Sequence, residues 1–201
     1  MSGRNCGGNA NRRRAACLLA CCLAVAVLCS CGSSGATAAG DSSPAVPAGL
    51  AACTPAGGGR AVAGGLPDLT LTCLGHGPGV RLAALRGPAL INLWASWCAP
   101  CGQETPMLQH AYRGHGTRVR FFGIDTRDLR GAALGFLRAK HVTYQQLSDK
   151  QGTLAAALHA PGLPVTVAID TGGKIVWHKA GQLTSNDLLA ALRAATGGVS
   201  P

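Results

Sequence analysis

The sequence has few charged and few aromatic residues for its length. Of 201 residues, 13% are charged and 4% are aromatic, and Glu104 is the only glutamate among the eight acidic residues. Basic residues give a net charge of +10, but they are scattered and not interleaved with aromatic side chains, which argues against nucleic-acid binding. Apolar residues make up 47% of the chain, enough for a packed core, so wholesale disorder is excluded.

Long apolar runs are scarce as well. The one extended run spans residues 15–29, and no second stretch reaches the 18 or more residues expected of a polytopic membrane protein. Three arginines at 12–14 precede the run, which is typical of a signal peptide. The run ends in Leu28-Cys29-Ser30-Cys31, which resembles a bacterial lipobox and implies lipidation of Cys31; an uncleaved anchor is the alternative. Either way, we expect the chain to sit at the cell membrane, facing outside the cytoplasm.

Composition divides the chain into three parts. Residues 1–30 are the expected lipoprotein-type signal peptide or membrane anchor. Residues 31–59 are rich in Gly, Ser, Ala and Pro, and we expect a flexible tether. Residues 60–201 hold the expected folded domain. Five of the ten cysteines lie in the first part, so Cys31, Cys53, Cys73, Cys98 and Cys101 remain after cleavage.

Hydrophobic patterns in the third part predict alternating strands and helices. A nearly continuous apolar run at 89–94 indicates a strand buried on both faces. The predicted strands cover 69–74, 80–82, 89–94, 119–124, 144–147, 164–170 and 174–178. The predicted helices cover 98–113 with an interruption at Pro106, 129–140, 153–159 and 187–195. This order is typical of the α/β class, with a mixed sheet sandwiched by helices.

The motif Cys98-Ala99-Pro100-Cys101 follows the buried strand and opens the next helix. Free N–H groups and the helix dipole stabilise negative charge at a helix start, so the pKa of Cys98 should fall below that of a free thiol. Cys101 lies one turn further in, where it can attack a mixed disulfide formed on Cys98. Pro100 presets the helical φ and has no N–H to lose there.

Other uses of these cysteines fit less well. A structural zinc site needs two more ligands, and no second Cys-x-x-Cys or His pair exists, so we expect no metal. A disulfide that closes so short a loop gives little stabilisation, which argues against a purely structural pair. Cys53 and Cys73 should pair with each other in an oxidising compartment. A structural disulfide is favoured for them, and a second redox pair that relays electrons to Cys98 is the alternative.

Two segments carry a family resemblance. Residues 92–101, followed by Glu104 and Pro106, closely resemble the active-site segment of the TlpA/ResA (DsbE-like) branch of the thioredoxin superfamily. Residues 162–170 and 172–176 look like the cis-proline loop of that family and the strand after it. The resemblance covers about residues 66–196. It implies a thioredoxin fold whose mixed central sheet is flanked by helices, with an N-terminal hairpin and an extra helix and strand near residues 129–157.

The resemblance also implies roles for particular residues. Pro164 should be cis and face the sulfur of Cys98, and Leu163 should offer its backbone to a bound peptide. Trp97 should form part of the substrate-facing surface. Asn92 stands where thioredoxin has a buried aspartate, so Glu104 is one candidate for moving the Cys101 proton. The alternative, which we favour, is that Glu104 is an acid in the first helical turn, stabilised by the dipole.

The function implied is extracytoplasmic thiol–disulfide exchange on cysteines of exported proteins, without a cofactor. Ala99-Pro100 resembles the dipeptide of reducing thioredoxins, which favours a reductant, with apocytochrome c as an expected substrate and a membrane thiol carrier as electron donor. An oxidant that installs disulfides is the main alternative. A peroxidase and a metal-binding lipoprotein on the same fold are remote alternatives.

Overall fold

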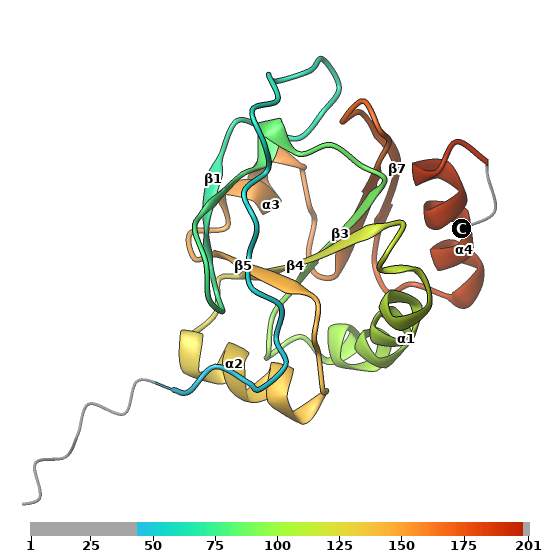
Figure 1. Cartoon of the computed structure of the whole chain (residues 1–201). Helices are drawn as coiled ribbons and strands as arrows, with labels where there is room; N and C mark the ends of the chain where they lie inside the picture. Colours follow the sequence, from blue (N-terminus) through green and yellow to red (C-terminus); the bar gives the residue numbers. More distant parts are fainter. Residues whose placement is uncertain (1–43, 199–201) are drawn as a thin grey trace, which may run out of the picture. The chain divides into compact units, whose positions relative to one another are not determined.

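The computed structural model describes residues 44–198 (Figure 1). The expected signal peptide, Cys31 and the first part of the expected tether lie outside these residues. The elements follow in chain order: β1 (Thr70–Cys73), β2 (Val80–Arg81), the 3₁₀ helix η1 (Leu82–Ala84), β3 (Ala89–Trp94), α1 (Ala99–His115), β4 (Arg120–Thr126), α2 (Arg130–Ala139), β5 (Gln145–Asp149), α3 (Thr153–Ala157), β6 (Val165–Ile169), β7 (Ile175–Ala180) and α4 (Ser185–Ala195).

The strands form one seven-stranded sheet in the order β2-β1-β5-β4-β3-β6-β7. The β3–β4 and β4–β5 pairs are parallel, and the other pairs are antiparallel. All residues of β3 and β6 are buried, as the continuous apolar runs predict for central strands. The mixed sheet with helices confirms the α/β class.

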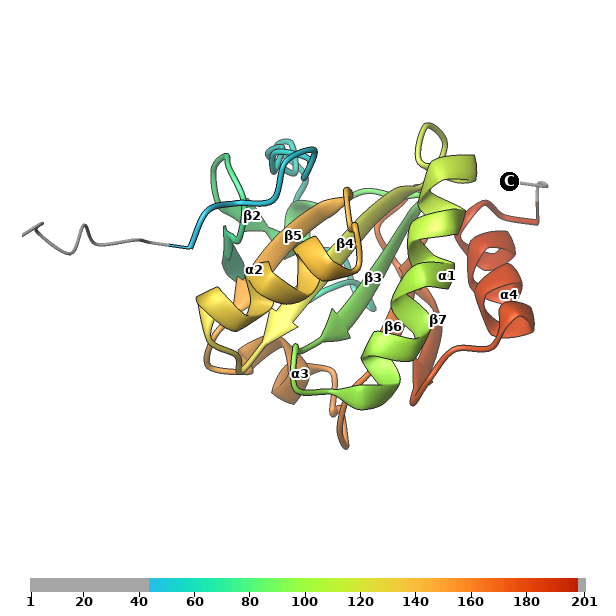
Figure 2. The ribbon, with the colours of Figure 1, turned by 90° about the horizontal axis from the view of Figure 1, so that it is seen from below.

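Two apolar clusters cover the two faces of the sheet. Residues of α1, α2 and α4 pack on one face, and Figure 2 shows α1 and α2 on the near side of the sheet. Residues of α3 and η1 pack on the other face, against alternate residues of the same strands. Cys98, Cys101 and Trp94 belong to the first cluster. The motif of interest therefore lies on the face covered by α1, α2 and α4.

Helix α1 differs from the expected interrupted helix. It runs from Ala99 to His115 with Pro106 inside it. A proline removes only one backbone donor, and the burial of Leu108 and Ala111 beyond it holds the later turns against the sheet. Helix α4 begins two residues earlier than predicted, because Thr184 and Asp187 form a capping box at its start.

Residues 44–59, which we call the N-terminal strap, pack on the domain although their composition predicts a tether. In Figure 1 this segment, at the blue end of the described chain, passes alongside β5 and β1. The Ala51 N–H donates to the carbonyl of Thr143 at 2.8 Å, and Leu50 is buried in the first apolar cluster. A disulfide joins Cys53 to Cys73 in β1. The packed part of the chain thus begins before residue 60, because a few apolar side chains and one crosslink outweigh the polar, glycine-rich composition.

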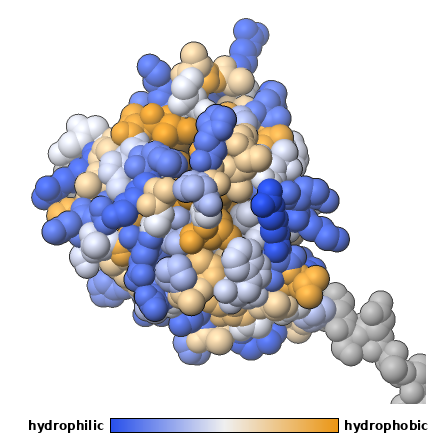
Figure 3. Space-filling view, turned by 180° about the vertical axis from the view of Figure 1, so that it is seen from behind, coloured by the Kyte–Doolittle hydropathy of each residue, from blue (hydrophilic) through white to orange (hydrophobic). Residues whose placement is uncertain are grey.

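The surface carries small apolar patches separated by polar groups on the face seen in Figure 3. Large apolar side chains that are exposed in the described part of the chain are Trp97, Leu129, Val176 and Leu189. Between residues 44 and 198, no helix combines the length and the apolar character needed to cross a membrane.

Candidate active site

Cys98 and Cys101 sit at the junction between β3 and α1. Strand β3 ends at Trp94, and Cys98 is the N-cap of α1, with Pro100 in the first turn. The two cysteines form a disulfide with a Cα–Cα distance of 5.3 Å. Cys98 is 5% exposed and Cys101 is fully buried, so an incoming group can reach only Cys98.

The helix start favours negative charge on Cys98. Its Sγ accepts the N–H of Cys101 at 3.3 Å, and the first turn of α1 carries no acidic residue. An N–H donor at a helix N-terminus stabilises a thiolate, and no nearby carboxylate on that turn opposes it. After reduction, Cys98 is therefore the thiol with the stronger reason to ionise.

The loop before β6 approaches the same end of β3. The Leu163–Pro164 peptide bond is cis. Strand β6 is antiparallel to β3 with Val165 opposite Leu93, which puts Pro164 beside the end of β3 that leads into Cys98. Two segments more than sixty residues apart, both singled out in the sequence, therefore meet at one edge of the sheet.

A groove of about 190 Å³ lies beside this junction. The Trp97 indole is 62% exposed along it, and its Nε1–H donates to the Arg127 carbonyl at 3.2 Å. Leu163 lines the groove from the cis-proline loop. The remaining lining residues come from β4, the loop after it, α3 and the loop before β6: Thr126, Arg127, Ala155, Ala160, Pro161 and Gly162.

Glu104 is not in the first turn of α1, which corrects the dipole interpretation. It is buried in the second turn, where Oε1 accepts Asn92 Nδ2 at 2.7 Å and Oε2 accepts the Leu183 N–H at 2.7 Å. Asn92 also donates to Thr166 Oγ1 at 2.9 Å. Burial raises the pKa of Glu104, and the two hydrogen bonds to it oppose that rise. The side chain ties α1 to β3 and to the segment before α4.

Trp94 is held away from the surface. It stacks on Phe136 of α2 with ring centroids 4.7 Å apart, and its Nε1–H donates to Gln146 Oε1 at 2.9 Å. The Gln146 side chain crosses β4 at Gly123, where a Cβ would come within 2.0 Å of Gln146 Oε1. Trp94 is therefore a packing residue, and Gly123 is required for the close approach.

Sequence reasoning missed three acidic residues near the motif. Asp125 is the second-last residue of β4, Asp128 lies in the loop after β4, and Asp149 ends β5. Asp128 Oδ2 accepts the N–H of Ser96, two residues before Cys98, at 2.6 Å. Burial, and then the charges of Asp128 and Asp149, raise the pKa of Asp125 to about 8. A signal was present, since a buried strand that ends in aspartate places a carboxyl at the edge where the motif lies.

The second disulfide is elsewhere in the sheet. Cys73 is in β1, which β5 and β4 separate from β3. Its Cα lies 5.9 Å from that of Cys53 in the N-terminal strap. Among residues 44–198, no group of three or more His, Cys, Asp or Glu side chains is arranged to hold a metal ion.

Comparisons with known proteins agree with this geometry. Residues 62–178 match the model of the AhpC/TSA family. A thiol:disulfide interchange protein DsbE homolog of Paracoccus denitrificans is 37% identical over 102 residues, covering 50% of this chain and 55% of that protein. The thiol-disulfide oxidoreductase ResA of Bacillus cereus is 26% identical over 132 residues, covering 65% of this chain and 76% of ResA.

A solved structure extends the likeness to the fold. A secreted Mycobacterium tuberculosis disulfide oxidoreductase, homologous to E. coli DsbE, superposes with a TM-score of 0.56 at 25% identity. The match covers 63% of this chain and 96% of that one. The chain spans between 55% and 60% of the length of the first curated relatives it matches. The family match shows that the chain belongs to the AhpC/TSA family, and within that family it is similar to proteins named DsbE and ResA.

Proposed function

We propose that this chain catalyses thiol–disulfide exchange through Cys98 and Cys101. The observation that carries the proposal is the place of this pair: a disulfide at the N-terminus of α1, next to a groove and the cis-proline loop. Curated relatives named thiol:disulfide interchange proteins support it.

The reaction needs only these two sulfurs. The Cys98 thiolate attacks one sulfur of a substrate disulfide, a mixed disulfide forms, and the first substrate thiolate leaves. Cys101 then loses its proton and attacks Cys98, which closes the intramolecular disulfide and releases the second substrate thiolate. Two electrons pass to the substrate, and the reverse sequence would oxidise a dithiol substrate. Burial of Cys101 protects it from attack by external disulfides, so the order of events is fixed.

The groove supplies a place for the substrate backbone and side chains. Trp97 and Leu163 offer apolar surface on two of its sides, and exposed aromatic side chains contribute strongly to recognition of extended peptides. We therefore propose unfolded or extended segments around cysteine as substrates, with Leu163 offering its backbone.

We propose further that the chain acts outside the cytoplasm on exported proteins, tethered to the membrane through Cys31 or an uncleaved anchor. The direction we propose is reduction, on the strength of Ala99-Pro100 between the cysteines, with apocytochrome c as the substrate expected from the family resemblance. Electrons would then come from a membrane thiol carrier.

The test is the reduction potential of the Cys98–Cys101 pair, measured on the full chain in detergent by equilibration with glutathione or dithiothreitol. A potential near about −270 mV supports a reductant, whereas a value near about −120 mV assigns an oxidant. Absence of a reversible two-electron couple would overturn the proposed exchange activity altogether.

A further inference from the structure

Asp125 lies on the face of the sheet that the dithiol occupies. It is opposite Trp94 in the parallel β3–β4 register, and residues in register point to the same side of a sheet. Trp94 shares the first apolar cluster with Cys98 and Cys101. The Asp125 carboxyl is therefore directed to the side covered by α1, one strand away from the segment that leads into Cys98.

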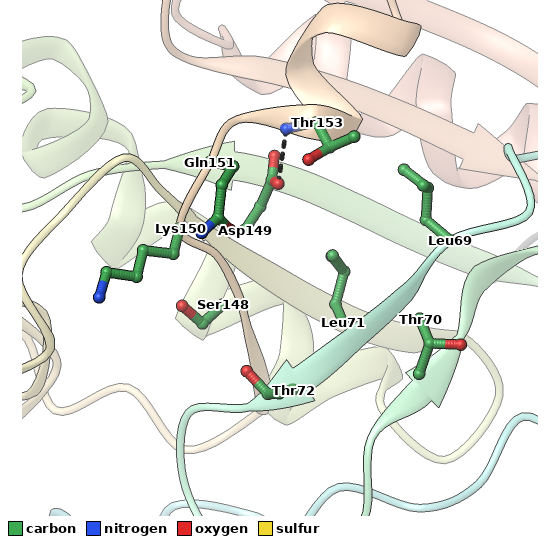
Figure 4. Close-up of a pocket in the computed structure, with 9 residues that line it drawn as sticks. All are labelled: Leu69, Thr70, Leu71, Thr72, Ser148, Asp149, Lys150, Gln151 and Thr153. Atoms are coloured by element: carbon green, nitrogen blue, oxygen red, sulfur yellow. Dashed lines mark hydrogen bonds between the residues drawn. The ribbon is translucent and has the colours of Figure 1, made fainter.

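Two neighbouring carboxylates are well supplied with N–H donors. Asp149 accepts the N–H groups of residues 153–155 at 2.7, 3.0 and 3.3 Å, and Figure 4 shows the first of these bonds, to Thr153. Asp128 accepts the N–H groups of Ser96 at 2.6 Å and Leu129 at 2.7 Å. Each oxygen of these two side chains therefore has an N–H donor.

Asp125 has the opposite surroundings. It is 1% exposed, and its Oδ1 has no hydrogen-bond partner among the described residues. A buried carboxylate with an unpaired oxygen is costly when two other acidic groups lie near it, so this member of the three holds the proton at neutral pH. A side-chain hydrogen bond to Asp128 favours the same protonated form. The charged groups that act on it are Asp128 after β4 and Asp149 on β5. Two helices of this face also carry titratable groups. Helix α1 carries the dithiol and Glu104, and Lys140 is the C-cap of α2.

Asp125 and the dithiol lie on one face of the sheet, at the end of β4 and just beyond the end of the neighbouring β3. Asp128 accepts a hydrogen bond from the N–H of Ser96. Ser96 lies two residues before Cys98, so the Cα atoms of Ser96 and Cys98 are at most about 7.6 Å apart. Unit charges about 10 Å apart, at an effective dielectric constant near 20, shift an equilibrium by about tenfold. Buried charges at such distances are screened little by salt.

We propose that Asp125 takes up a proton when the Cys98–Cys101 disulfide is reduced, so that a buried carboxyl on β4 makes the redox equilibrium depend on pH. This inference rests on the proposed function, in which Cys98 becomes a thiolate. The new negative charge makes ionisation of Asp125 harder in the reduced form than in the oxidised form. By linkage, ionised Asp125 disfavours the reduced form.

Reduction of the Cys98–Cys101 disulfide by glutathione is balanced in protons at about pH 8 to 9. Two glutathione thiols reduce the disulfide to one Cys98 thiolate and one Cys101 thiol, which yields glutathione disulfide and leaves one proton over. Between the pKa of Asp125 in the oxidised form and its higher pKa in the reduced form, that proton passes to the Asp125 carboxylate. Below the window Asp125 already holds a proton, and above it Asp125 stays ionised in both forms.

The experiment is the glutathione equilibrium of the full chain from about pH 6.5 to about pH 9.5. The wild-type protein is compared with Asp125→Asn, which mimics the neutral acid, and with Glu104→Gln, which neutralises the other buried acid near the motif. As pH rises, the glutathione equilibrium of the wild type should shift toward the disulfide. The shift should be about tenfold larger than in Asp125→Asn. Glu104→Gln should keep the wild-type pH dependence.

Parallel curves for the wild type and Asp125→Asn would overturn the inference, and so would loss of the extra pH dependence in Glu104→Gln. If Asp125→Asn fails to fold, carboxyl-carbon NMR of the wild-type chain replaces it. The Asp125 titration midpoint should lie about one pH unit higher in the reduced form, and equal midpoints would again overturn the inference. A chain with a normal reversible couple but no extra pH dependence keeps the proposed function, whereas no couple at all removes both.

Discussion

The two disulfides of this chain differ in what each one closes. Cys98 and Cys101 are three residues apart and join the first turn of α1 to itself. Cys53 and Cys73 are twenty residues apart and fasten the N-terminal strap to β1. In the chain-entropy model the longer loop is worth about 3 kcal/mol and the shorter one much less. Opening the first bond leaves the fold in place, whereas opening the second releases a constraint on the whole N-terminal part.

The surroundings of the two bonds follow the same division. The Cys98 sulfur has an N–H donor at a helix start and a groove beside it, which suit a bond that opens and closes. Cys53, in the strap, is buried as a member of the apolar cluster that includes residues of α3 and η1. The length of the closed loop and the access of a substrate to the sulfur therefore distinguish an exchangeable disulfide from a structural one. The presence of two cysteines alone does not.

The largest effect on exchange activity is expected at the first pair. Cys98→Ser should abolish exchange, because Cys101 is fully buried and cannot attack a substrate in its place. Cys101→Ser should leave attack intact but stop resolution, so substrates accumulate as mixed disulfides on Cys98. Non-reducing gels and mass spectrometry of trapped adducts measure both. Adducts on Cys101 in the Cys98→Ser variant would reverse the assigned roles.

Removal of the second pair should lower the stability of the fold and leave exchange activity nearly unchanged. The double variant Cys53→Ser and Cys73→Ser should lose about 3 kcal/mol of unfolding free energy, because the unfolded chain gains freedom. Exchange with glutathione should stay within about twofold of the wild type. Denaturant unfolding and the exchange rate are measured on the same sample. A large fall in exchange would instead favour a relay between the two pairs.

Contacts of the N-terminal strap can be separated from its crosslink. Leu50→Ala should cost about 2 kcal/mol of unfolding free energy, since the side chain is 8% exposed and packs in the first apolar cluster. Combined with the serine double variant, the costs should add to within about 0.5 kcal/mol if the strap stays docked without the disulfide. Clear non-additivity in denaturant melts would show that the crosslink itself holds the strap in place.

The smallest effect should come from the groove beside the first pair. Trp97→Ala should raise the KM for a cysteine-containing peptide about fivefold, because partial burial of an indole contributes about 1 kcal/mol. Exchange with glutathione, which is too small to use the groove fully, should not change. Val176→Ala, at an apolar side chain 41% exposed on β7, is the matched control. Equal losses for peptide and glutathione would contradict a recognition role for Trp97.

Much of the fold was predictable because its signals are local. The apolar run of β3, the glycine turn before β7 and the proline in the first turn of α1 each depend on a few neighbouring residues. The capping box of Thr184 and Asp187 is an equally local signal for the start of α4. Pro106 alone predicts an interruption of α1, but the packing of the later turns outweighs the one missing hydrogen bond.

The site was predictable in part for a different reason. The cysteine motif and the cis-proline segment are each recognisable alone, and the antiparallel β3–β6 pair brings them together. The sequence indicates that Asp125 lies near the end of a buried strand, but the burial of its carboxyl depends on β5 and on the loop that follows β4. The docking of the N-terminal strap likewise joins Ala51 to Thr143, about ninety positions away, and runs against the local composition.

Most elements, the α/β class and the chemical character of the Cys98–Cys101 pair follow from the sequence alone, because they depend on periodicity and short spacing. The acids near that pair, the partners of Glu104 and the start of the packed chain depend on the three-dimensional fold. Those outcomes depend on which distant groups share a buried space, since burial and unpaired polar atoms, rather than residue type, set the cost of a charge.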